Sequence, residues 1–94
     1  MKAFQVNMRA YADAAKRAGY GYSRIAASAG YSKGHWSDLM SGKIPNPSIL
    51  AAARVALAYR VTVNDLLTGD AKAQRLIAAK VEKSFKRKGI EDDE

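Results

Sequence analysis

The stretch Ser23–Gly42 (SRIAASAGYSKGHWSDLMSG) decides the fold of this 94-residue chain. Its apolar side chains recur at helical spacing in two short runs. The first run (i, i+1, i+4) holds Ile25, Ala26 and Ala29, and the second (i, i+3, i+4) holds Trp36, Leu39 and Met40. Each run predicts a short helix with one buried face, and the residues between them leave room only for a tight turn.

The turn has its own sequence signals. Gly30 follows the first run, where a left-handed backbone conformation is accessible to glycine at little cost. Ser32 can accept a hydrogen bond from the free N–H groups at the start of the second helix. Ala26 is small where the two helices must cross closely. These features predict a helix-turn-helix unit, which can present its second helix to the DNA major groove.

The composition predicts one folded domain. Apolar residues make up 48 % of the chain, and a chain of this length buries roughly 60–65 % of its unfolded surface. No apolar run approaches the length of a membrane-spanning helix, and no secretory signal pattern opens the sequence. The absence of cysteine excludes disulfides and thiolate metal sites. We expect a cytoplasmic, nucleoid-associated protein with no metal and no cofactor.

The positive charge is concentrated in the first part of the chain. Residues 1–69 hold nine basic and three acidic side chains, a net charge of +6, whereas residues 70–94 hold seven and six, a net charge of +1. A strongly basic domain is the electrostatic footprint of a phosphate binder. Charge alone leaves solubility as an equally good interpretation, so the nucleic-acid hypothesis needs the helix-turn-helix pattern as well.

Capping signals place the other helices. Asn7 is predicted to cap a first helix over about Met8–Ala18, and Lys2–Val6 is a weaker candidate for a short extended arm. Asn46 followed by Pro47 predicts the start of a fourth helix that ends near Tyr59. That helix is apolar almost all round, so it is either central to the bundle or partly buried in a partner subunit.

Two further helices are predicted after the fourth. Residues 62–65 (TVND) resemble a capping box that starts a short helix ending at Thr68-Gly69. Asp70 can cap a last helix reaching about Lys88, closed by Gly89 and followed by a disordered acidic tail over residues 91–94. Its apolar stripe either forms a dimer surface or folds back on its own bundle. The stripe consists of Ile77, Val81 and Phe85.

Over about Tyr11–Gly69, this pattern resembles the phage-repressor/Cro-like (Xre) helix-turn-helix family. The resemblance implies a five-helix repressor-like DNA-binding domain over residues 1–69. Residues 70–94 would add a C-terminal helix for possible dimerisation and the acidic tail, giving an all-α fold class. The matching motifs are Gly19-Tyr20, Ile25-Ala26, Gly30, Ser32, Trp36, Leu39, Gly42-Lys43, Asn46-Pro47-Ser48-Ile49, Ala56, Tyr59 and residues 61–67 (VTVNDLL).

The chain also departs from the family pattern. Ala15 and Met40 stand where the family often pairs an arginine with a glutamate, and because both are apolar no buried charge is stranded. Arg60 occupies the place where a glycine usually ends the fourth helix. Tyr22 replaces a frequent glutamine, and Gly34 replaces a larger base-reading side chain, so the base preference is not carried over.

The resemblance implies that the free side of the helix at about residues 32–41 reads base edges. Lys33 can donate to guanine or to a phosphate, and Asp38 can accept from cytosine. Trp36 is expected in the core rather than as a base-stacking platform. The expected base-contacting residues are Lys33, Gly34, His35, Ser37 and Asp38, and the expected phosphate-contacting residues are Gly21, Tyr22, Arg24, Ser32, Lys43 and Asn46.

These expectations favour a sequence-specific double-stranded DNA-binding transcription regulator of bacterial or phage type, acting on its operator as a homodimer. The alternative is an antitoxin or protein-interaction adaptor of the same fold, which would contact RNA polymerase or another protein through its C-terminal helix. A non-specific nucleoid binder also fits the charge. We do not expect an enzyme, because the chain has one histidine, no cysteine and no glycine-rich phosphate loop after a strand.

Overall fold

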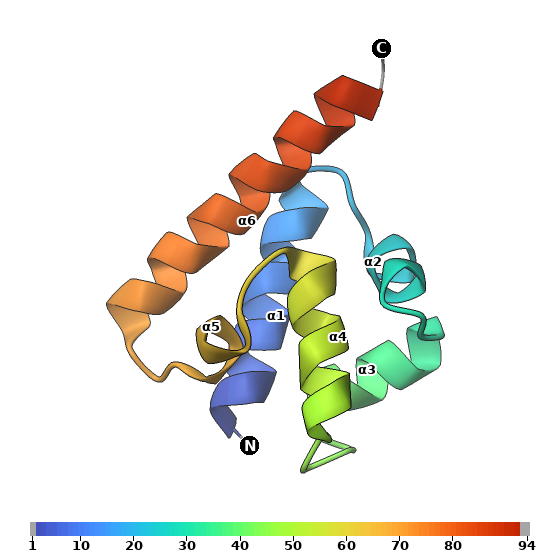
Figure 1. The fold of residues 1–94 in the computed structure, drawn as a ribbon, viewed down its shortest axis with the longest axis vertical. Helices are drawn as coiled ribbons and strands as arrows, with labels where there is room; N and C mark the ends of the chain where they lie inside the picture. The colour runs from blue at the N-terminus through green and yellow to red at the C-terminus, as the bar shows by residue number, and fades with distance from the viewer. Residues whose placement is uncertain (1, 93–94) are drawn as a thin grey trace.

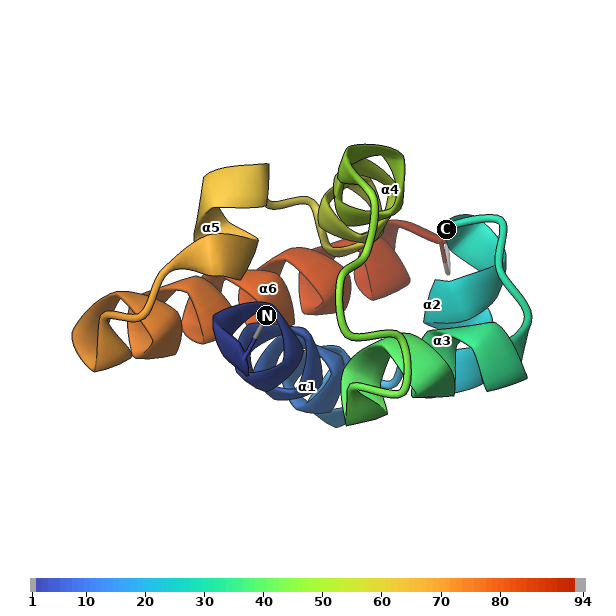
Figure 2. The same cartoon turned by 90° about the horizontal axis from the view of Figure 1, so that it is seen from below.

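Six α-helices make up the computed structural model, which describes the backbone of residues 2–92 and the side chains of residues 3–86. No strand occurs among these residues, so the expected all-α class is confirmed at that level. Figures 1 and 2 show the order of the helices around α1. The helices are α1 (Lys2–Arg17), α2 (Tyr22–Ser28), α3 (Lys33–Ser41), α4 (Ile49–Tyr59), α5 (Val63–Leu67) and α6 (Ala71–Asp92).

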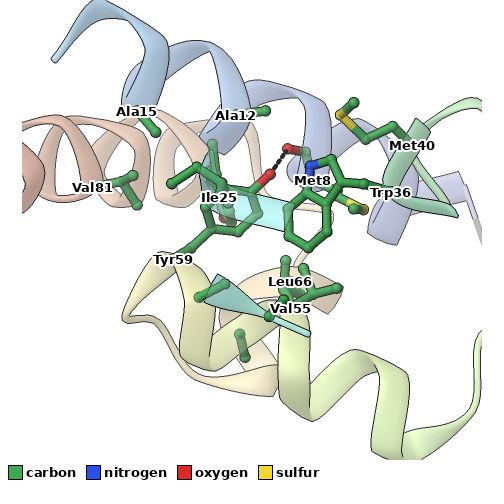
Figure 3. Packing of buried hydrophobic residues seen from close by; sticks show 14 of the residues in the cluster. Met8, Ala12, Ala15, Ile25, Trp36, Met40, Val55, Tyr59, Leu66 and Val81 are labelled. Atoms are coloured by element: carbon green, nitrogen blue, oxygen red, sulfur yellow. Dashed lines mark hydrogen bonds between the residues drawn. The ribbon is translucent and has the colours of Figure 1, made fainter. Parts of the chain in front are cut away.

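All six helices contribute buried side chains to one core around α1. Trp36 packs edge-on against Tyr59, with ring centroids 5.5 Å apart, and Tyr59 packs in the same way against Tyr11 at 6.0 Å. The hydroxyl of Tyr59 donates a hydrogen bond to the carbonyl oxygen of Met8 at 3.0 Å (Figure 3). Burial raises the pKa of the Tyr59 phenol above its usual value. This aromatic cluster joins α3 to α4 and α1.

Helix α1 is longer than the sequence signals predicted. It begins at Lys2, so the proposed extended arm over Lys2–Val6 is wrong, and Phe4 extends the buried stripe by one turn. Asn7 does not cap the helix but lies inside it, fully buried. Its amide nitrogen donates to the carbonyl oxygens of Leu66 and Thr68, each at 2.8 Å. These carbonyls lie at the end of α5, where a helix has no donors of its own.

Helix α4 begins later than predicted. Its cap is Ser48, whose hydroxyl accepts a hydrogen bond from the backbone N–H of Ala51 at 3.1 Å, so the predicted start at Asn46-Pro47 is wrong. The predicted end at Tyr59 is confirmed, and Arg60 follows with a left-handed backbone (φ 61°). This is the place where the resemblance implied a glycine. The predicted capping box between Thr62 and Asp65 is present.

Helix α6 packs across α1 as part of the same core (Figure 1). Val81 and Phe85 are buried, so the stripe folds back on its own bundle. The predicted cap is present, because a carboxylate oxygen of Asp70 accepts from the N–H of Lys72 at 3.0 Å. Gly89 does not end the helix, which continues to Asp92 because one interior glycine costs only about 1 kcal/mol. Residues 91 and 92 of the predicted disordered tail are therefore helical, and residues 93–94 lie outside the described part.

Polar contacts also hold α6 in place. The guanidinium of Arg17 pairs with the carboxylate of Glu82 at 2.8 Å. Arg60 donates from one guanidinium nitrogen to the carbonyl and hydroxyl oxygens of Ser84, at 3.3 and 3.1 Å. The same guanidinium carbon lies 4.6 Å from the ring centroid of Phe85. The left-handed residue after α4 thus ties that helix to α6.

Candidate nucleic-acid interface

Helix α3 has defined ends. The hydroxyl of Ser32 accepts a hydrogen bond from the backbone N–H of His35 at 3.1 Å, which confirms the predicted cap. Gly42 ends the helix with a left-handed backbone (φ 87°). Gly30, in the turn before α3, also has positive φ (80°), as predicted. Local backbone geometry therefore defines both ends of α3.

One side of α3 is buried and the other is free. Trp36 and Leu39 are 0 % and 1 % exposed, and Met40 is 9 % exposed. Lys33, Gly34, His35 and Ser37 are exposed on the opposite flank, and Asp38 is half-buried. The prediction that Trp36 belongs to the core is confirmed. All five predicted base-contacting residues lie outside the buried side, and four of them are exposed.

The first turn of α3 carries two further features. The imidazole of His35 stacks on the ring of Tyr31, with centroids 4.6 Å apart and an angle of 14° between the planes. This contact orients His35 toward the turn rather than straight outward. Gly34 faces open space, because a Cβ at this position would meet no atom within 4 Å. A ligand backbone can therefore approach α3 closely at Gly34.

The predicted phosphate contacts do not all lie together. Ser32 and Lys43 are exposed at the two ends of α3, and Asn46 is exposed in the loop that follows. Gly21 precedes α2 and supplies no side-chain cap. The hydroxyl of Tyr22 donates to a carboxylate oxygen of Asp13 at 3.0 Å. That hydrogen bond raises the pKa of the Tyr22 phenol.

Arg24 lies apart from the other predicted phosphate contacts. It follows Tyr22 by two residues, which places it about 200° further around α2. Its guanidinium stacks over the ring of Tyr20, 4.3 Å from the centroid. Arg24 thereby lines a groove of about 360 Å³ whose other walls include Leu57, Arg60 and Phe85. The expected role of Arg24 beside α3 therefore receives no support from its geometry.

Sequence reasoning did not single out α1 as part of this surface. Gln5, Val6 and Arg9 line a groove of about 290 Å³ together with Met40 and Ser41 at the C-terminal end of α3. Figure 2 shows α1 and α3 along the same edge of the molecule. Helical spacing alone places Gln5, Val6 and Arg9 on one side of α1. Only the packing of α1 against α3 shows that this side lies beside α3.

Among the described residues, no group of three side chains could hold a metal ion. None of the described helices is long and apolar enough to cross a membrane. Comparison with protein-family models, with curated proteins and with solved structures found no match for the chain. Side-chain chemistry and geometry are thus the basis for assigning a function.

Proposed function

We propose that the chain is a sequence-specific double-stranded DNA-binding transcription regulator of the phage-repressor/Cro-like kind. Its recognition element is α3 (Lys33–Ser41). The observation that carries the proposal is the division of this capped helix into a buried apolar side and a free polar side. A helix with its side chains is about 10–12 Å across, and the major groove of B-DNA is about 12 Å wide.

Three of the free side chains of α3 suit a base edge. Lys33 donates and matches the two acceptors of guanine, O6 and N7. Ser37 both donates and accepts, and Asp38 accepts from the amino group of cytosine. Gly34 lets the helix approach the groove floor, because nothing projects there. These donors and acceptors give sequence discrimination rather than charge attraction alone.

The charge around α3 also supports the proposal. Only three acidic residues occur in residues 1–69. Asp13 accepts from the Tyr22 hydroxyl, and Asp65 accepts from the backbone N–H of Thr62 at 2.9 Å. Asp38 is the remaining carboxylate. Two of the three negative charges are thus held by internal hydrogen bonds, within a region of net charge +6.

Selection of bound sites from a random duplex pool at physiological salt tests sequence preference and symmetry together. On the selected site, Lys33→Ala and Ser37→Ala should each cost about 1–3 kcal/mol and relax one base position. Lys43→Ala should weaken all sequences alike and reduce the salt slope by about one. Lys72→Ala, an exposed charge at the start of α6, is the matched control. Unchanged binding in all three α3-region variants would contradict the proposal.

The proposed active species is a homodimer, because one recognition helix covers too few base pairs. Val81 and Phe85 of the α6 stripe lie inside the monomer, so the proposed interface is on α4, which carries three of the six exposed large hydrophobic side chains among the described residues. At about 100° per residue, the outward side chains of α4 span an arc of about 140°. We call this surface the outer α4 face. It consists of Ile49, Leu50, Ala53, Arg54 and Leu57.

Exposure on the outer α4 face is high for apolar side chains. Ile49 is 87 % exposed, Leu57 is 77 % exposed and Leu50 is 62 % exposed. Contiguous exposed apolar side chains mark interaction surfaces. Leu50→Asp should convert a dimer to a monomer in sedimentation, whereas Leu76→Asp on α6, at a residue 58 % exposed, should not. A symmetric dimer would also select half-sites about 34–36 Å apart.

The outer α4 face also favours one alternative, a protein-interaction adaptor or antitoxin of the same fold. In that case the exposed leucines would contact a different protein instead of a second copy. Burial of Val81 and Phe85 removes the apolar stripe of α6 from such a contact. A contact through the outer side of the C-terminal helix and the acidic tail stays a prediction. A monomer that ignores duplex DNA even at low salt would favour this alternative.

A further inference from the structure

The side of α1 that faces the helix-turn-helix unit carries two cations. Gln5, Arg9 and Lys16 recur at i, i+4 and i+11, which places them along one side of the helix. Arg9 and Lys16 are exposed, and Gln5 is half-buried. We call this side of α1 the α1 ridge. Arg17, which pairs with Glu82 of α6, lies about 100° around α1 from the middle of this ridge.

The first part of the α1 ridge reaches the C-terminal end of α3. Arg9 shares a groove with Ser41. The side chain of Gln5 lies against Gly42, because a Cβ at Gly42 would come within 2.9 Å of the Gln5 amide nitrogen. Lys43 is the next residue and is exposed. Arg9 and Lys43 therefore lie on two sides of the same corner, where α3 ends.

The second part of the α1 ridge reaches the start of α2. The ammonium of Lys16 lies 5.6 Å from the ring centroid of Tyr22. The hydrogen bond to Asp13 raises the pKa of the Tyr22 phenol, and the positive charge of Arg9 acts on the same pKa in the opposite direction. The α1 ridge therefore runs beside both helices of the helix-turn-helix unit.

Neither cation of the ridge forms an ion pair among the described side chains. The ion pairs among the described side chains join Glu82 to Arg17 and to Lys86. Asp13 is four residues after Arg9, the usual spacing for a helical ion pair. Its carboxylate instead accepts from Tyr22. The Asp13 carboxylate lies within one turn of both Arg9 and Lys16, so two cations and one carboxylate leave one net positive charge at the edge shared by α1 and α3 (Figure 2).

We infer that α1 is a second phosphate-binding element, in which Arg9 and Lys16 contact the sugar-phosphate backbone of the duplex that α3 reads. This inference rests on the proposed function. Arg9 and Lys43 would hold the strand that passes the C-terminal end of α3, and Lys16 would hold the strand near Tyr22. Neither α1 side chain reaches a base edge, so the contacts add affinity and orientation without adding sequence preference.

Fluorescence anisotropy on the selected duplex and on a random duplex, from 50 to 200 mM salt, tests this role. Each phosphate contact contributes about 0.9 to the slope of log affinity against log salt. Arg9→Ala and Lys16→Ala should therefore each make the loss of affinity over this range about 3.5-fold smaller. Both should weaken the two duplexes by the same factor. Arg9→Lys should retain the slope, because the charge is kept.

Arg75→Ala is the control, since it removes one exposed positive charge from the first part of α6, at the far end of the molecule from α3 (Figure 1). Equal thermal unfolding of all variants would show that each remains folded. Slopes of Arg9→Ala and Lys16→Ala that equal that of Arg75→Ala would overturn the role of α1. In that outcome Lys33→Ala and Lys43→Ala would still weaken binding, and the regulator proposal would stand. Wild-type protein that does not bind duplex DNA would overturn both.

Discussion

Replacement of Asn7 tests whether the buried amide between α1 and α5 stabilises the fold. In the wild-type protein its amide nitrogen donates to two carbonyl oxygens, of Leu66 and Thr68, at 2.8 Å each. Asn7→Ala removes both bonds without placing a larger group in the core. We expect a loss of stability rather than a local rearrangement, because Asn7 is 0 % exposed and water does not replace it easily.

The magnitude follows from the partners that remain. The Leu66 carbonyl loses its buried donor, which costs about 1–3 kcal/mol. The Thr68 carbonyl keeps the side-chain amide of Gln74 as a donor at 2.9 Å, so the loss of Asn7 there costs about 0.5–1.5 kcal/mol. Removal of the Asn7 amide oxygen, buried without a partner among the described atoms, offsets about 1 kcal/mol. The net expectation is about 2 kcal/mol, or a fall in Tm of about 8–16 °C.

Urea unfolding followed by circular dichroism measures this change. The midpoint should fall at an unchanged m value, because the native fold and the exposed surface on unfolding stay the same. Asn64→Ala is the matched control, since Asn64 is exposed on α5 and should change stability by no more than about 0.5 kcal/mol. A loss for Asn7→Ala no greater than that of the control would refute the reasoning.

Substitutions at three further residues each test one local interaction. Ser32→Ala should lower the free energy of unfolding by about 1 kcal/mol through loss of the α3 cap, and Ser32→Asp should restore it; equal urea midpoints for all three proteins would contradict this. Arg60→Gly should be more stable than Arg60→Ala by about 1 kcal/mol in urea unfolding, because φ at this residue is 61°, and equal values would show that no strain is stored there. Arg17 and Lys86 hold the pKa of Glu82 below its usual 4.5, so the stability it contributes is present above that pH and is lost as the pH falls. Glu82→Gln should flatten the acid side of a stability profile, and an unchanged acid side would show that these ion pairs contribute nothing.

Local sequence signals predicted that the helices exist, but they predicted less well where each helix begins. Ser32 and Thr62 are caps whose partners lie three residues away, so local spacing identified both correctly. Asn7 and Asn46 are equally good cap residues by type, yet neither caps a helix. The donors of Asn7 serve carbonyls about 60 residues later in the chain, which no local pattern contains.

In the candidate interface, too, some features follow from local spacing and others only from tertiary packing. The free and buried sides of α3 followed from the spacing of Trp36 and Leu39, and their exposures agree with it. Arg24 was assigned to the same surface as Tyr22, although the rotation of α2 separates them and the ring of Tyr20 holds Arg24 elsewhere. No local pattern marks Arg9, because its significance depends on which helix packs beside it.

Residue order alone specified an all-helical chain, a tight bend between two short helices, and a positive first part, because these depend on spacing, glycine conformation and charge. Tertiary packing decided that Val81 and Phe85 cover the chain's own bundle while Ile49, Leu50 and Leu57 remain exposed. Both sets are apolar and helical, so hydrophobicity cannot distinguish them. The choice depends on which faces meet when α6 crosses α1, and this is a property of the assembled helices rather than of any one segment.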